Sequence, residues 1–109
     1  MLEIVRQAQA QFMEIESILS SNVAKDQNYF TILSEMTDKA YVTMNNGMSE
    51  SATVCHECAQ HRDYLLSMLD LLEELSAGKE FTSDDKEQLD AFAQKIGEIL
   101  SKISSALEA

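Results

Sequence analysis

One short stretch of the chain carries the residue types that perform metal and redox chemistry, and it reads Cys55-His56-Glu57-Cys58-Ala59-Gln60-His61. Cys55, Cys58 and His61 are three residues apart, so on a helix they would climb one broad side with successive Cβ atoms about 5–6 Å apart. Thiolate and imidazole groups suit Zn or Cu(I). Met44 and Met48 precede the stretch and would add soft thioether ligands. A metal-binding or redox-active helical bundle is therefore one hypothesis.

The ligand set is incomplete, and this favours a structural role. A structural zinc site takes four ligands, typically from two elements, and the chain has no second CxxC or HxxxH motif. Haem attachment needs a histidine where Ala59 stands, and a thioredoxin-like CxxC opens a helix within a βαβ pattern. We therefore expect no cofactor. Cys58 is predicted to fill the core and His61 to be a core or boundary histidine bonded to a neighbour; a Zn or Cu site at Cys55, Cys58 and His61 is the alternative.

No other pattern predicts catalysis. The three glycines stand far apart at positions 47, 78 and 97, so no glycine-rich phosphate loop is present. Most acidic residues fall on the polar faces of predicted helices, and the serines have no adjacent base that would activate them. We therefore predict a protein that is not an enzyme.

The elements that position these residues are predicted to be helices. The chain has no Pro and only three Gly, which disfavours a turn-rich sandwich or barrel. Apolar residues recur at helical spacing over residues 2–21, 26–46, 50–77 and 83–107. Asp26 and Thr82 are expected N-caps, and Gly47 and Gly78 are expected to end the second and third helices. Gly97, four residues after Ala93, is expected to let another helix approach closely.

Four amphipathic helices joined by short loops predict an all-α fold. The expected architecture is an antiparallel up-down-up-down four-helix bundle in one domain, residues 1–109. The alternative is a pair of helical hairpins that completes its core only as a dimer.

The charge balance limits the classes of partner. The chain has 19 Asp and Glu residues against 8 Lys and Arg, a formal net charge of −11. Such a chain repels phosphate backbones and anionic membrane surfaces, so neither nucleic acid nor a membrane is expected as a direct partner. No apolar run reaches the ~18–20 residues of a membrane span, and the first residues lack the basic start of a signal peptide. A cytoplasmic location is the expectation.

Helices 2–21 and 26–46 carry more apolar residues than one buried face needs. Within residues 27–49 the only charged residues are Glu35, Asp38 and Lys39. The chain is therefore predicted to be an acidic interaction protein, such as an adaptor, a chaperone-like protein or a regulatory subunit, that binds a protein partner or itself. A further alternative is an acidic decoy that inhibits a nucleic-acid-binding protein. The predicted partner-binding residues are Leu2, Ile4, Ile18, Phe30, Tyr41 and Val42.

Overall fold

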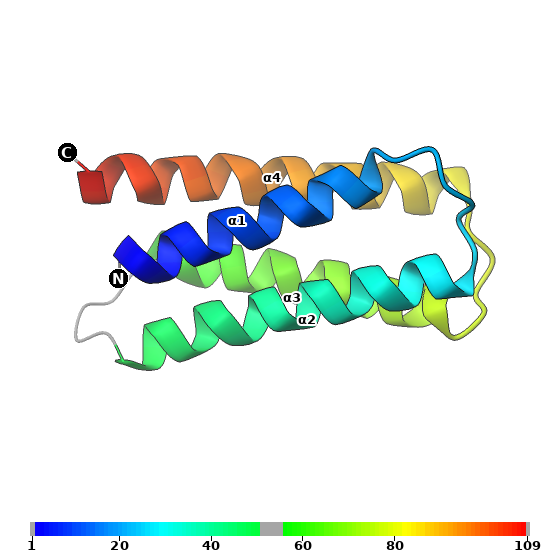
Figure 1. Cartoon of the computed structure of the whole chain (residues 1–109), viewed down its shortest axis with the longest axis horizontal. Coiled ribbons are helices and arrows are strands. Elements are labelled where there is room, and N and C mark those ends of the chain that lie inside the picture. The colour runs from blue at the N-terminus through cyan, green and yellow to red at the C-terminus, as the bar shows by residue number, and fades with distance from the viewer. Residues whose placement is uncertain (1, 51–55, 109) are drawn as a thin grey trace.

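The computed structural model describes residues 2–50 and 56–108, and these residues form four helices. The helices are α1 (Leu2–Leu19), α2 (Gln27–Glu50), α3 (His56–Ser76) and α4 (Ser83–Glu108). They lie side by side along the long axis of a body of 42 × 22 × 19 Å (Figure 1). Each helix packs against two others in a ring, α1 on α2, α2 on α3, α3 on α4 and α4 on α1. The predicted all-α four-helix bundle is confirmed.

Two helices begin at the predicted N-caps. The side chain of Asp26 accepts a hydrogen bond from the Tyr29 backbone N–H at 2.9 Å, at the start of α2. At the start of α4 the Thr82 hydroxyl accepts a bond from the Asp85 N–H, and the Asp85 carboxylate accepts one from the Thr82 N–H, both at 3.1 Å. This reciprocal pair satisfies two backbone donors that the helix leaves unpaired.

The end of α3 is also as predicted. Gly78 has a φ of 109°, which is the left-handed conformation. Its N–H donates to the Leu75 carbonyl, and the Lys79 N–H donates to the Glu74 carbonyl. Together these two bonds form a Schellman motif, which closes the helix.

The predicted end of the second helix is wrong. Instead of stopping at Asn45-Asn46-Gly47, α2 continues to Glu50. Gly47 is a buried helical residue against α1: a Cβ atom placed on it would lie 2.6 Å from Ile4 Cγ2. Gly47 therefore serves the close approach of two helices rather than a turn. Serines are frequent N-caps, and the sequence offers Ser49 and Ser51 for the third helix. Ser49 lies within α2, and Ser51 is outside the described residues.

The core is built within one chain, from the inward faces of all four helices. Val5 and Leu33 are fully buried on α1 and α2, as are Leu72 and Ile96 on α3 and α4. The two ends of the chain lie at one end of the bundle, and the α1–α2 and α3–α4 connections lie at the other (Figure 1). One chain thus assembles a continuous core without a second copy.

The buried face of α2 differs from its apolar spacing at two positions. Phe30, predicted to bind a partner, is 3% exposed, whereas Ile32, which shares the spacing of the buried Tyr29, Leu33, Ala40 and Met44, is 42% exposed. The ring of Phe30 packs against Tyr29 and Phe81, with ring centroids 5.1 and 5.0 Å apart. Phe81 belongs to the α3–α4 connection, so this loop extends the core and draws Phe30 inward.

Candidate interaction surface

The stretch that offered metal chemistry is only partly described, because Cys55 lies outside the described residues. Cys58 is fully buried and disulfide-bonded, so its sulfur is not a free thiolate ligand in this structure. His56 is exposed. Among residues 2–50 and 56–108 no group of three or more His, Cys, Asp or Glu residues is arranged to hold a metal ion.

His61 occupies the core, as predicted, but without the expected hydrogen bond. It is 1% exposed, and neither ring nitrogen has a hydrogen-bond partner in the described part of the chain. Burial lowers its pKa from 6.5 to about 4, because the imidazolium form would lose its hydration. His61 is therefore neutral near pH 7 and acts there as a packing residue.

The six predicted partner-binding residues do not form one exposed face. Phe30 is buried in the core, and Ile4, Ile18 and Tyr41 are partly buried. Val42 is 45% exposed and lies on the outer side of α2. The side chain of Leu2 is outside the described ones. Of the five whose side chains are described, Val42 is the exposed one.

A different apolar surface lies where α1, the α1–α2 connection and α2 meet. We name it the α1–α2 surface, and its apolar residues are Met13, Ile18, Val23, Ile32 and Met36. Two hollows of about 510 and 380 Å³ run along it and share Ser17 and Ile18. The charged residues that line them are Glu14 and Asp26.

Tyr29 fixes the α1–α2 connection beside this surface. Its hydroxyl donates to the Ile18 carbonyl at 3.2 Å, which ties α2 to the end of α1. The Lys25 ammonium lies 4.6 Å from the centre of the Tyr29 ring, a cation–π contact. Burial raises the pKa of Tyr29, and the charge of Asp90 adds to the effect. These contacts join the end of α1, the connection and the start of α2 beside the hollow, which Val23 and Ala24 also line.

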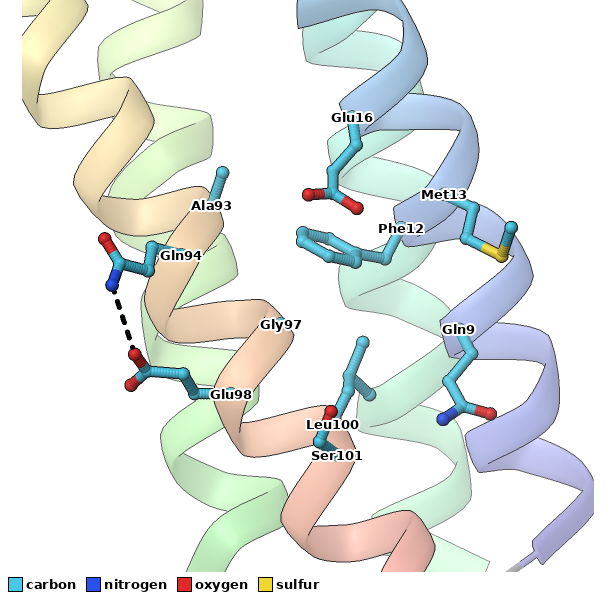
Figure 2. A pocket seen from close by; sticks show the side chains of 10 residues that line it. All are labelled: Gln9, Phe12, Met13, Glu16, Ala93, Gln94, Gly97, Glu98, Leu100 and Ser101. Atoms are coloured by element: carbon cyan, nitrogen blue, oxygen red, sulfur yellow. Dashed lines mark hydrogen bonds between the residues drawn. The ribbon is translucent and has the colours of Figure 1, made fainter.

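A third hollow, of about 670 Å³, opens between α1 and α4 (Figure 2). We name it the α1–α4 groove. Phe12 projects into it from α1, and Gly97 faces it from α4 (Figure 2). A Cβ atom at position 97 would lie 3.2 Å from Phe12 Cε2, so the prediction that Gly97 serves close packing is confirmed.

The chain matches no protein-family model, no curated protein and no solved structure. Within the described residues no helix is both long and apolar enough to cross a membrane. The site must therefore be interpreted from its own geometry. That geometry shows exposed apolar side chains beside two helix–helix seams.

Sequence reasoning missed most of the α1–α2 surface. Ile32 and Met36 share the apolar spacing of the second helix, which favours a core position for both; Met36 packs partly buried against the core, and Ile32 does not. Val23 lies between helices, where no periodicity can place it. One signal was available: Phe30 and Thr37 share a helix side, and a stripe centred on them would leave Ile32 outside.

Proposed function

We propose that this chain is a small, acidic, non-catalytic interaction protein that binds a protein partner through the α1–α2 surface. The observation that carries the proposal is a group of exposed apolar side chains beside a core that is complete without them. Met13, Val23 and Ile32 are 69%, 55% and 42% exposed. Grouped apolar surface of this kind is typical of protein-binding sites.

The charge of the chain favours a different protein over a second copy. Each copy carries a net charge of −11, so two copies repel one another. The two charged residues that line the surface, Glu14 and Asp26, are both acidic. A symmetric dimer would bring the same acids of both copies to one interface. A partner with an apolar, neutral or basic face meets no such repulsion, and the flexible side chains of Met13 and Met36 can adapt to it.

The decisive experiment compares two matched substitutions. Ile32→Asp places an acid on the α1–α2 surface, and Leu66→Asp places one on α3 at a nearly equal exposure, 42% against 40%. Proteins are captured from extracts of the native cell at low and high salt. The partner should bind the wild type and Leu66→Asp equally well. Its affinity for Ile32→Asp should be lower by about tenfold or more. The difference should persist at high salt because apolar contacts are not screened.

Three outcomes would contradict the proposal. If both variants retain the same proteins, the α1–α2 surface is not the binding site. If Val42→Asp abolishes capture and Ile32→Asp does not, the outer side of α2 is the site instead. If light scattering shows a dimer that Ile32→Asp dissociates, the surface binds a second copy.

A further inference from the structure

The α1–α4 groove is an elongated channel between two helices. Its main hollow shares Glu16, Ala93 and Gln94 with a second hollow of about 400 Å³, so the two are continuous. On α1 the lining runs from Gln9 to Leu19 and continues to Ser20 just beyond the helix, and on α4 it runs from residue 86 to residue 101. At 1.5 Å per residue these walls are about 17 and 22 Å long, which is the length of three to four helical turns.

The floor of the channel is apolar and includes a glycine, Gly97. Phe12, Ala93 and Leu100 line the main hollow. The missing side chain at Gly97 lets the Phe12 ring approach α4, and both residues line the hollow (Figure 2). Met13 stands at the rim and is 69% exposed. An apolar floor between two helices suits the apolar stripe of another amphipathic helix.

The rim of the channel is acidic. Of the ten residues that line the main hollow, the charged ones are Glu16 and Glu98. The Glu16 carboxylate lies beside the Phe12 ring, over the groove (Figure 2). Further along, Lys86 and Asp90 form an ion pair at 2.9 Å, so their charges cancel. Glu98 also lies 3.8 Å from Lys95, which does not line the hollow, in an exposed ion pair of the kind that contributes little. The lining residues themselves therefore have a net charge of −2, from Glu16 and Glu98.

We propose that the α1–α4 groove binds a basic amphipathic helix of a partner protein, of about three to four turns. Its leucine-like side chains lie on Phe12 and over Gly97, and its lysine or arginine side chains reach Glu16 and Glu98. A second copy of this chain fits poorly, because it would bring its own carboxylates against the same rim. The proposal concerns a different seam from the α1–α2 surface and does not depend on it.

The probe is a labelled synthetic peptide of leucine and lysine, about fourteen residues long, with leucines at positions i, i+3, i+4 and i+7. A scrambled peptide of the same composition has no apolar face when helical. Binding is measured by fluorescence anisotropy at physiological salt, where distant surface charges are screened beyond about 8 Å. We expect the amphipathic peptide to bind about tenfold more tightly than the scrambled one.

Two pairs of variants locate the site. Glu16→Lys with Glu98→Lys should weaken binding about tenfold, whereas Glu73→Lys with Glu74→Lys, which changes the net charge equally on α3, should change it less than about threefold. Ser101→Gln adds volume at the groove without charge and should weaken binding at least about threefold, with exposed Ser67→Gln as its control. Circular dichroism checks that each variant keeps its helices.

Several results would overturn the proposal. Equal binding of both peptides, or equal weakening by both charge-reversal pairs, would mean that the peptide senses only the net charge of the molecule. Binding unaffected by Ser101→Gln would place the peptide elsewhere. A dimer that Ser101→Gln dissociates would identify a second copy as the occupant. Ile32→Asp should leave peptide binding unchanged, so this proposal and the proposed function can fail separately.

Discussion

His61 shows how a single residue can make the stability of the bundle depend on pH. Its buried ring has no hydrogen-bond partner among residues 2–50 and 56–108, and burial lowers its pKa from 6.5 to about 4. The unfolded chain therefore binds a proton at a higher pH than the folded chain. Stability is unaffected by this residue above about pH 6.5 and falls as the pH falls from there toward 4. The full loss is about 3 kcal/mol at 1.36 kcal/mol for each pKa unit.

Replacing His61 by Leu should remove this loss. Because the ring nitrogens bond to no group in the described part of the chain, an apolar side chain of similar size is expected to be neutral or stabilising near pH 7. Urea unfolding across the range from pH 7 to about pH 5 should then show a shallower decline than wild type. Exposed His56→Gln is the control and should keep the wild-type profile. Identical slopes for wild type and His61→Leu would show that His61 is not responsible.

Gly47 is a residue whose role depends on a distant contact. Alanine is a better helix former than glycine by about 1 kcal/mol, so helix propensity alone predicts that Gly47→Ala is stabilising. The added Cβ would lie 2.6 Å from Ile4 Cγ2, which is too close. We expect net destabilisation of about 1–2 kcal/mol. Chemical denaturation measures it.

A double-mutant cycle tests the cause. Ile4→Ala removes the opposing atoms, so Gly47→Ala should be neutral or stabilising when made in that background. The coupling energy between the two positions should then be at least about 1 kcal/mol. Additive effects would show that the backbone of α2, rather than the contact with Ile4, requires glycine.

At the scale of the helix, local sequence predicted what local contacts determine. Asp26, Thr82 and Gly78 have the predicted roles because each bonds to groups within five residues of itself. The prediction from Asn45-Asn46-Gly47 was wrong for the opposite reason. These three residues resemble a helix end, but Gly47 instead packs against Ile4, which is far away in sequence. Phe30 was misplaced on the outer side of α2 because Phe81, in another connection, packs against its ring.

The Thr82–Asp85 capping pair should set the stability of the first turn of α4. Thr82→Ala removes the acceptor of the Asp85 N–H and should cost about 1 kcal/mol. Ser83→Ala, one residue later on the exposed surface, is the matched control and should cost much less. Thermal unfolding compares the two. Equal melting temperatures would show that the hydroxyl of Thr82 is unimportant.

Asp85 adds a pH dependence of its own to this turn. The hydrogen bond from Lys79 Nζ at 2.5 Å and the bond from the Thr82 N–H hold the pKa of its carboxyl below the usual range. Its stabilising effect is therefore complete above the ordinary Asp value and is lost as the pH falls through the lowered one. In Asp85→Asn, the free energy of unfolding should therefore fall less steeply with decreasing pH than in wild type. This difference should appear at lower pH than the effect of His61.

At the scale of the whole molecule, the acidity is uneven and mostly unpaired. Residues 56–108 hold twelve acids and five bases, a balance of −7, and residues 1–50 hold seven acids and three bases, a balance of −4. The ion pairs found in the described part of the chain are mainly between exposed partners, which stabilise little. Repulsion among like charges therefore opposes the compact state.

Added salt should stabilise the bundle. Raising NaCl from about 0.01 to about 0.15 M shortens the screening length from about 30 to about 8 Å, less than the width of the molecule. We expect a gain on the order of 1 kcal/mol, or about 4–8 °C in Tm. Thermal unfolding in a salt series measures it, with sucrose as an uncharged control. A Tm that falls with salt would mean that favourable ion pairs outweigh the repulsion.

The number of helices and the existence of a closed core follow from periodicity, but the outward faces do not. The helical period of 3.6 residues determines which residues share one side of a helix. The packing of the neighbouring helices and loops determines which side faces the core. The α1–α2 surface arises from this packing, because Ile32 leaves the core where Phe30 enters it. The α1–α4 groove arises from residues about eighty positions apart, Phe12 and Gly97, which no local pattern connects.

Tyr29 gives the molecule an optical reporter of its own. The chain has no Trp and three Tyr, and Tyr29 is the tyrosine held by a hydroxyl bond to Ile18 and by the Lys25 ammonium over its ring. The near-ultraviolet circular dichroism and the fluorescence emission of Tyr29 therefore change when the packing of α1 against α2 changes. A partner that docks beside Ile18 can be followed through this ring, without any label, by difference spectra against a Tyr29→Phe variant.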